Sequence, residues 1–357
     1  MKKSVSALLL LLYLLAALLS FAACTPSDAV MEYQTRSKTV SYTHFNTVSI
    51  LSSYGDITDE QFAGYLQTAD ELLGYYHKLF DIYYEYAGVN NLRTVNRNAG
   101  VKPVTVDEEL IEFLLYCKEL YALTGGKTNV MLGSVLRIWH EARELADEQG
   151  GLLDEALLPD QGELAEAAEH TSIDLLVIDR EAKTVYISDA RASIDVGAIA
   201  KGYAATKLAE KLKAEGADAI AVNAGGNIVT VGKKPNGKAW VAGIKNPDRT
   251  AENNLICRVE IGADALVTSG DYERYFVSGD RKYHHIIDPD TLMPAAYFSS
   301  VSVFTQDGGL ADALSTALFC MPYEQGRALV ESIGNVEVIW IDTDGRLVST
   351  DGVRMAE

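Results

Sequence analysis

The chain has 357 residues, of which 48% are hydrophobic, and its formal net charge is −19. Because this length exceeds the size at which a single hydrophobic core usually stops growing, one large bilobal domain or two domains are expected. The negative charge argues against nucleic acid as a partner and against a patch for anionic membranes, since both kinds of surface need clustered Lys and Arg.

The first residues of the chain are typical of an export signal, predicted over residues 1–24. A Lys-Lys pair opens the segment, a leucine-rich run extends from Ala7 to about Leu19, and SFAAC closes it at Cys24. The run is short for a permanent membrane span. A cysteine at this boundary resembles the bacterial lipobox, which implies an exported protein lipid-anchored to the outer face of the cell membrane, or on the periplasmic side in a Gram-negative cell. A secretory signal cleaved elsewhere is the alternative.

Residues 25–38 are polar and are predicted to form a tether before one domain over residues 39–357. In that domain Cys117, Cys257 and Cys320 are widely spaced and form no CxxC or CxxxH pair. This spacing disfavours a zinc site and thioredoxin-type chemistry. Cys117 lies on a predicted helical face and is expected to be a buried small hydrophobic residue.

Hydrophobic periodicity predicts the elements of the first half of the domain. They are a strand at 39–51, a helix at 60–76, an irregular loop at 79–100, helices at 106–124, 129–151 and 154–170, and a hairpin formed by 174–179 and 184–189. The helix at 129–151 is expected to leave the core after Trp139, where its sequence changes from apolar to strongly charged.

Residues 193–230 are predicted to be the unit around which the rest is arranged, with the order strand, glycine turn, helix, strand. Asp195 and Lys201 flank the turn, so that free backbone N–H groups and one ammonium gather at a helix N-terminus, which favours an anion. After the helix, Asn223 and the Gly225-Gly226 pair interrupt an apolar strand and permit close approach of a flat ligand. An ordinary crossover with a tight turn is the alternative.

The second half of the domain is predicted to be mainly strands. The expected elements are strands at 237–247, 255–267, 272–277, 282–287 and 300–305, a helix at 311–321, and a closing hairpin over 334–350.

Four separated segments are unusual for a structural core: DVGAIAKGYA at 195–204, NAGGNI at 223–228, TSGDYERYF at 268–276 with HHIIDPDT at 284–291, and ADALSTAL at 311–318. Together they resemble, in order, the DxGxxAKGYA, NxGG, TSG, HxIDPxTG and DAxxT motifs of the ApbE family, the FAD:protein FMN transferases. The resemblance covers roughly residues 40 to 345. It implies an α+β (mixed α/β) fold, a single bilobal domain with mixed sheets flanked by helices.

The resemblance implies that Asp195 and Lys201 contact FAD and that Mg²⁺ is bound by the carbonyl of Ala198 and the side chains of Asp312 and Thr316. The spacing of Asp312 and Thr316 places both oxygens on one helical face. Mg²⁺ prefers a few hard oxygens, with water and substrate phosphate completing its shell. A capping Asp and a Thr bonded to its own helix are the alternative reading.

The resemblance also implies residues that bind the flavin and the rest of the cofactor. They are Phe45, Tyr83, the turn residues Lys127, Thr128 and Asn129, the motif residues Asn223, Gly225, Gly226, Ser269 and Gly270, and Ile287. Four places depart from the family pattern. Asn129 replaces the usual Asp, and MLGS at 131–134 replaces the usual TVGP. Leu292 stands where the family has Gly after Thr, and Ser315 stands where some relatives have a second Asp beside the metal.

His285 is the candidate catalytic base, because it aligns with the motif histidine and an unperturbed imidazole titrates near neutral pH. Asp288 is the candidate to orient it, although Asp-Pro after a strand is often only a turn. If His284 and His285 both lie on a strand, they point to opposite faces, so only one of them can reach the site.

The resemblance implies a magnesium-dependent transferase that cleaves FAD at its pyrophosphate, attaches FMN through a phosphoester to Thr or Ser of an exported acceptor flavoprotein, and releases AMP. Two alternatives stay open: magnesium-dependent hydrolysis of FAD to FMN and AMP, and a lipid-anchored flavin-binding protein without turnover. The last is disfavoured by His285, Asp312 and Thr316, because binding alone needs no base beside a metal.

Overall fold

The computed structural model describes residues 35–356 except positions 42 and 263. Cys24 and the predicted signal lie outside the described residues. Residues 35–38, assigned to the tether from sequence, instead begin strand β1 (Thr35–Ser41), because their backbone pairs with β2 (Ser49–Tyr54). No helix in this described part is long and apolar enough to cross a membrane.

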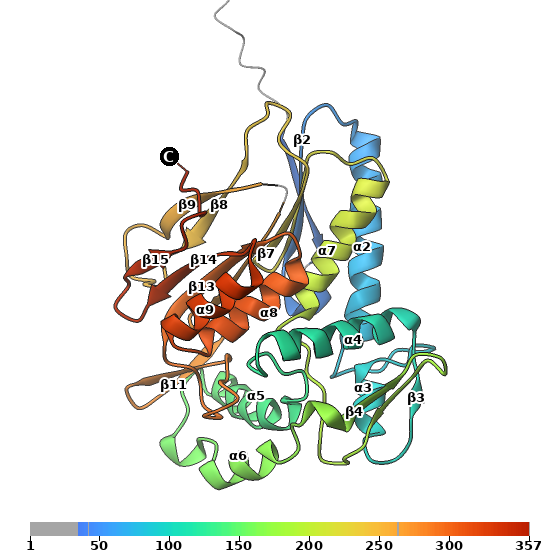
Figure 1. The fold of residues 1–357 in the computed structure, drawn as a ribbon, viewed down its shortest axis with the longest axis vertical. Helices are drawn as coiled ribbons and strands as arrows, with labels where there is room; N and C mark the ends of the chain where they lie inside the picture. The colour runs from blue at the N-terminus through green and yellow to red at the C-terminus, as the bar shows by residue number, and fades with distance from the viewer. Residues whose placement is uncertain (1–34, 42, 263, 357) are drawn as a thin grey trace, which may run out of the picture. The chain divides into compact units, whose positions relative to one another are not determined.

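The centre of the fold is an eight-stranded sheet in the order β1-β2-β6-β7-β10-β13-β14-β15 (Figure 1). Each neighbouring pair is antiparallel. Its other strands are β6 (Ile220–Ala224), β7 (Asn227–Val231), β10 (Ala265–Gly270), β13 (Phe298–Thr305), β14 (Glu337–Asp342) and β15 (Leu347–Ser349).

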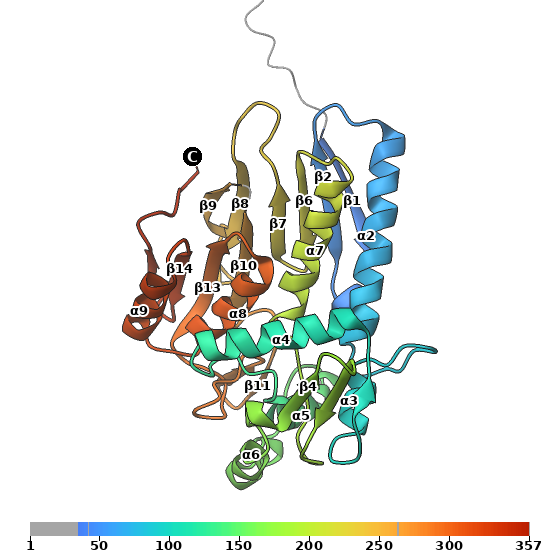
Figure 2. The same ribbon diagram turned by 45° about the vertical axis from the view of Figure 1, so that its right-hand side comes forward.

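Three helices cover one face of this sheet: α2 (Asp59–Phe80), α7 (Ala200–Ala214) and α8 (Gly308–Phe319). Figure 2 shows α7 and α8 lying in front of the strands. Leu73, Leu208 and Leu314 from these helices are fully buried in the main core. The opposite face packs against the pair β8 (Trp240–Lys245) and β9 (Leu255–Ile261) through a second set of apolar side chains that includes Trp240 and Leu266.

The remaining elements lie mostly around one end of the sheet, except α9 (Tyr323–Ile333), which packs beside α8 against the main core. They are the helices α3 (Leu92–Arg97), α4 (Glu108–Leu123), α5 (Gly133–Glu148), α6 (Gln161–Ala168) and α9, the strands β3 (Val104–Thr105), β4 (Leu176–Asp179), β5 (Thr184–Ile187), β11 (Tyr275–Ser278) and β12 (Arg281–His284), and three 3₁₀ turns, η1 (His44–Asn46), η2 (Glu155–Leu157) and η3 (Ile173–Leu175).

The α+β class and most of the predicted helices and hairpins are confirmed. The predicted strand at 39–51 is wrong as one element, because η1 divides it into β1 and β2. Phe45 and Asn46 adopt left-handed φ values of 56° and 52° there, and the Ser41 hydroxyl accepts hydrogen bonds from the amides of Thr43 and His44. A side chain thus satisfies backbone groups that a continuous strand would have paired.

Two other continuous elements also divide. The predicted strand at 255–267 becomes β9 and β10, because the hydroxyl of Thr230 bonds the carbonyls of Gly262 and Asp264 and fixes a turn. The predicted helix at 154–170 is interrupted before Pro159, where the preceding Leu158 takes the extended backbone that a following proline favours.

The helix at 129–151 does not leave the core after Trp139. Ala142 and Ala146 are buried in a separate apolar cluster with α6 and β11. The predicted strand before α7 is also absent from the described residues, where the amide side chain of Asn96 instead bonds both the N–H and the C=O of Ile194. Helix α9 was not predicted as an element.

Candidate active site

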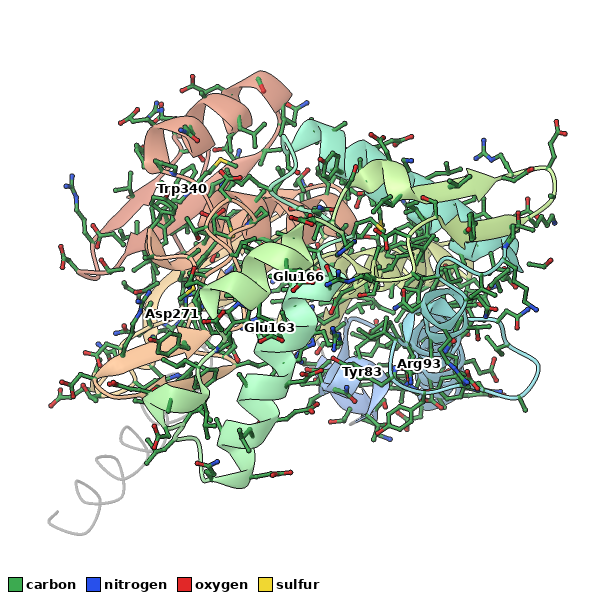
Figure 3. All side chains as sticks on the ribbon, turned by 90° about the horizontal axis from the view of Figure 1, so that it is seen from below. Tyr83, Arg93, Glu163, Glu166, Asp271 and Trp340 are labelled. Atoms are coloured by element: carbon green, nitrogen blue, oxygen red, sulfur yellow. The ribbon has the colours of Figure 1, made fainter. Side chains whose placement is uncertain are left out.

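A cavity of about 550 Å³ opens at one end of the main sheet. Every candidate site residue within the described part of the chain lines it: Phe45, Tyr83, Lys127, Thr128, Asn129, Asp195, Ala198, Lys201, Asn223, Gly225, Gly226, Ser269, Gly270, His285, Ile287, Asp312 and Thr316. Figure 3 looks at the molecule from below and shows Tyr83 and Asp271, the residue after Gly270, on opposite sides of α5. The sequence motifs therefore converge on one site.

The turn before α7 is shaped by Asp195, whose Oδ1 accepts a hydrogen bond of 2.9 Å from the amide of Gly197. Lys201 folds back over this turn, and its Nζ donates to the carbonyl of Gly197 at 3.2 Å. The N-cap residue of α7, Ile199, provides no side-chain hydrogen bond to the first turn. The amides of Ala200 and Gly202 in the first turn are already bonded, to the Val196 carbonyl and the Asp312 carboxylate, so the Lys201 ammonium is the group at the start of α7 that favours an anion.

Asp312 joins three elements at the cavity floor. Its Oδ2 accepts hydrogen bonds from the amide of Gly202 on α7 at 2.9 Å and from Nδ2 of Asn227 on β7 at 2.7 Å, and it lies 3.8 Å from Nζ of Lys201. The residue that caps α8 is Asp307, whose side chain accepts from the amide of Leu310. Asp312 is therefore not the capping residue of the alternative reading.

Helices α7 and α8 contact each other through glycine. A β-carbon on Gly202 would lie 2.0 Å from the carbonyl oxygen of Gly308 and 2.8 Å from Cβ of Asp312. The second glycine of DVGAIAKGYA is thus required sterically, because any side chain there would separate the helix start from the Asp312 carboxylate.

The donor set at this floor consists of oxygens: the Ala198 carbonyl, the Asp312 carboxylate and the Thr316 hydroxyl. Among the described residues there is no group of three His, Cys, Asp or Glu side chains that could bind a metal. Such a sparse set of hard oxygens fits Mg²⁺ completed by phosphate and water better than a transition metal. Ser315 bonds the Ser269 hydroxyl at 2.8 Å and the Asp312 carbonyl at 2.9 Å, so its side chain is occupied by the protein.

His285 lines the cavity with a defined tautomer. Its Nδ1 donates to the carbonyl of Arg274 at 3.2 Å, and its backbone amide donates to the same carbonyl at 3.1 Å. Because a carbonyl can only accept, Nε2 carries the free lone pair. Desolvation by the cavity walls and the positive charge of Arg274 lower the pKa of His285 to about 3, so the imidazole is neutral at physiological pH.

His284 points away from the site, which confirms that only one of the pair faces the cavity. Its Nε2 lies 2.8 Å from the carbonyl of Ala295, and its ring packs edge-on against Phe319 with centroids 5.5 Å apart. Desolvation lowers the pKa of His284 as well. Its role is to fill the core and to satisfy the Ala295 carbonyl.

The expectation that Asp288 orients His285 is wrong. The buried Asp288 carboxylate instead forms an ion pair of 2.8 Å with Lys127, which also contacts Asp290 at 2.8 Å. Burial alone would lower the pKa of Lys127, but the two hydrogen-bonded carboxylates raise it overall. Lys127 therefore connects the turn before α5 to the segment after β12. Because two carboxylates neutralise its ammonium, it is not available to pair with a charged ligand.

The residue that orients His285 is Arg274, through its backbone, and the sequence did not single it out. The three residues before it are each fixed by a cation. Lys282 pairs with Asp271 at 2.7 Å, Arg249 donates to the carbonyl of Tyr272 at 3.2 Å, and Lys245 pairs with Glu273 at 2.7 Å. The sequence feature that could have identified it is the motif TSGDYERYF, in which Arg274 lies four positions after the predicted site residue Gly270.

The other end of the cavity is aromatic. The amide of Phe45 donates to Nδ1 of His77 at 3.3 Å, and the two rings meet edge-on at 5.9 Å. Tyr83 is 47% exposed, and its hydroxyl lies 3.2 Å from Nδ1 of His140 on α5. Gly225 adopts φ +62°, and a β-carbon there would lie 2.3 Å from the Thr47 hydroxyl. This end suits a flat ring system.

Thr128 and Asn129 line the cavity, but their polar groups bond the protein. The Thr128 hydroxyl donates to the carbonyl of Ala313 at 2.7 Å, and its amide donates to the Thr124 hydroxyl. The Asn129 side-chain amide donates to the carbonyl of Thr171 at 2.9 Å, its side-chain oxygen accepts from the amide of Met131 at 2.9 Å, and its backbone carbonyl accepts from the amide of Leu132. These groups therefore fix the turn before α5.

Comparisons with known proteins match most of this chain to one family. The profile of the ApbE family matches residues 45–340. An FAD:protein FMN transferase of Treponema pallidum is 33% identical over 278 residues, covering 73% of this chain and 73% of its own length. Another from Haemophilus influenzae is 25% identical and covers 98% of this chain and 96% of its own.

Solved structures show the same fold. The crystal structure of an ApbE protein from Thermotoga maritima superposes with a TM-score of 0.75 at 25% identity, over 90% of this chain and 97% of that one. The flavin transferase ApbE from Vibrio cholerae gives a TM-score of 0.72 at 24% identity, over 89% and 97% of the two chains.

Proposed function

Because this chain belongs to the ApbE family, we propose that it is an FAD:protein FMN transferase. The observation that carries this proposal is the single cavity of about 550 Å³ that joins an aromatic end, the anion-binding start of α7 with Lys201, the oxygen donors Asp312 and Thr316, and a neutral imidazole at His285. Flavin, pyrophosphate and a hydroxyl nucleophile would each find chemically suited residues in it.

In the proposed reaction a threonine or serine hydroxyl of the acceptor protein attacks the flavin-side phosphorus of FAD. A new phosphoester bond forms, the P–O bond to AMP breaks, and AMP leaves with the bonding electrons. The proton of the hydroxyl moves to Nε2 of His285, whose tautomer leaves that nitrogen free to accept it. The phosphates of FAD would raise the pKa of the imidazole on binding and so strengthen it as a base.

Ala198, Asp312 and Thr316 would hold a magnesium ion that FAD phosphates complete. When bound, it would supply neutralisation of the charge on the transferring phosphoryl group. Lys201 contributes in the same direction, because its ammonium lies between the Asp195 turn and Asp312.

We further propose that the protein is exported and anchored by a lipid on Cys24. This part rests on the sequence pattern of residues 1–24 alone. The acceptors would accordingly be exported or membrane-attached proteins that carry a threonine or serine at an accessible position.

The decisive experiment is incubation of the protein without its signal segment, with FAD, magnesium and an exported protein fraction. We expect intact-mass spectrometry to show addition of FMN to a protein and chromatography to show release of AMP, both abolished by excess EDTA. FMN and AMP without a modified protein would favour the hydrolase alternative. FAD binding without any AMP would favour the non-catalytic flavin-binding alternative.

A further inference from the structure

Strand β10 extends past one of its two neighbours. β13 pairs with all six residues of β10, whereas β7 pairs only with Ala265 and Leu266. The reason is that the β6–β7 hairpin turns back at Gly225 and Gly226. In an antiparallel sheet, alternate residues direct N–H and C=O groups to each side. Within the described part of the chain, no strand pairs with β10 from Val267 to Gly270 on the β7 side.

This open edge borders the cavity on both faces of the sheet. Ser269 faces α8, since its hydroxyl lies 2.8 Å from that of Ser315. Thr268 and Gly270 point to the other face, because side chains alternate along a strand. On that face the cavity is lined by Gly243, Lys245, Leu266, Thr268, Gly270 and Tyr272, a set that we call the β10 branch.

The β10 branch is open to solvent on one side only: Gly243 and Lys245 are exposed and Thr268 is half-buried, whereas Leu266, Gly270 and Tyr272 are buried. Two of its residues, Gly243 and Gly270, have no side chain. At its rim Lys245 and Glu273 form a pair of 2.7 Å with side chains 57% and 44% exposed. An edge strand with free backbone groups is a template for one more extended chain.

The branch also leads to the reacting atoms. Most residues expected to bind FAD lie at the aromatic end, in the turn after β6 and at the start of α7, whereas Ser269 and Gly270 lie on β10 itself. The branch continues from Gly270 through Tyr272 to Arg274, whose carbonyl orients His285. A chain lying along the branch would thus run toward His285.

We propose that the acceptor protein binds as an extended segment that pairs with the open edge of β10 between Val267 and Gly270, and that this pairing delivers its hydroxyl to His285. The inference rests on the proposed transferase function and adds the binding mode of the second substrate. The chemical step is the one given above, with the hydroxyl proton passing to Nε2 of His285 and AMP leaving.

The first test uses the substitution Thr268→Leu, which places a larger side chain in the β10 branch and so narrows the space for a bound chain. Thr184→Leu on β5 is the matched control, because Thr184 lies on a strand of a different sheet and does not line the cavity. We expect FMN transfer to exported proteins to fall at least about tenfold in Thr268→Leu and to stay unchanged in the control, with FAD affinity by fluorescence titration within about twofold in both. Loss of FAD affinity in Thr268→Leu would show that the branch binds FAD, and would overturn the proposal.

The second test uses the wild-type protein and probes strand pairing directly. A pooled library of nine-residue peptides with a central threonine is incubated with FAD and magnesium, and FMN addition is read by mass. The best peptide is then resynthesised with one N-methylated amide at each position in turn. We expect losses of at least about tenfold at alternate positions and small losses between them, the two-residue period of a paired strand.

Equal tolerance of N-methylation at all positions would overturn the proposal. So would modification of whole proteins with no peptide modified, since that result requires a folded acceptor surface. If neither proteins nor peptides gain FMN and no AMP forms, the proposed transferase function fails as well, and the two failures are thereby distinguished.

Discussion

At the scale of single residues, the ionisation of His285 determines how the cavity acts on a hydroxyl. Its folded pKa of about 3 is below the ordinary value of about 6.5. Between these two values the unfolded chain binds the additional proton, so the stability contributed by neutral His285 is complete above about pH 6.5 and is lost as the pH falls toward 3. The imidazole of His285 in the free enzyme therefore stays unprotonated well below neutral pH.

We expect the imidazole NMR signals of His285 in the FAD-free protein to stay constant from pH 8 to pH 5, because the ring stays neutral through this range. The signals are assigned by their disappearance in His285→Gln. A transition centred near pH 6.5 would show that solvent reaches the ring freely and that the wall around it is looser than the structure indicates.

Substitution of the two neighbouring histidines should separate catalysis from stability. His285→Ala is expected to lower FMN transfer by at least about 10²-fold while FAD affinity changes only several-fold, because a general base acts mainly in the transition state. His284→Ala should retain most of its activity per folded molecule but lose about 1–3 kcal/mol of stability, since the Ala295 carbonyl loses its donor. Turnover and urea unfolding of both variants test this. A large loss of transfer in His284→Ala with little loss in His285→Ala would contradict the assignment of His285 as the base.

Asp312→Asn removes one negative charge while preserving an acceptor for the Gly202 amide. We expect it to abolish magnesium-dependent turnover with a change in FAD affinity of less than about tenfold, because the metal acts on phosphate charge that changes during transfer. Turnover is measured across a magnesium titration, and thermal unfolding confirms the fold. Wild-type turnover that is unchanged by excess EDTA would exclude this metal site.

At the scale of elements, the contact of α7 with α8 assembles the site. Gly202→Ala places a methyl group 2.0 Å from the Gly308 carbonyl oxygen, so the helices must separate, at a cost of about 1–3 kcal/mol or more. We expect a lower melting temperature together with weaker FAD binding. Gly64→Ala on α2 is the control: nothing lies within 4 Å of its β-carbon, and it should stabilise the protein by about 0.5–1 kcal/mol. Equal effects of the two substitutions would refute the role of this contact.

Sequence reasoning found the helices with strong periodicity and the motif residues that it placed in the cavity, but it missed Arg274 within the same motif. It failed where side chains replace backbone pairing. Ser41 divides one apparent strand, Thr230 another, and Asn96 satisfies the backbone of Ile194 from about a hundred positions away. It also could not assign Lys127 to Asp288, or Arg274 to His285, because such partners are set by tertiary packing and not by spacing.

At the scale of the whole molecule, the proposed attachment to a membrane depends on the predicted signal segment and its Cys24. We expect Cys24→Ser to move the protein from the membrane fraction to the soluble fraction, since a lipid on that thiol would be its anchor. Fractionation and intact-mass measurement of the wild-type protein test this. Sedimentation of the variant with membranes, together with a wild-type mass that lacks lipid, would refute the anchor.

The direction of β1 sets a working distance for such an anchored enzyme. The strand runs over seven residues from Thr35 to Ser41, and the cavity residue Phe45 follows four positions later. An extended strand rises about 3.3 Å per residue, so β1 alone separates its first residue from the cavity by about 20 Å. We infer that, if Cys24 carries the proposed lipid, the length of β1 would contribute to the separation between anchor and cavity, and acceptors whose threonine or serine stands clear of the bilayer would be modified first.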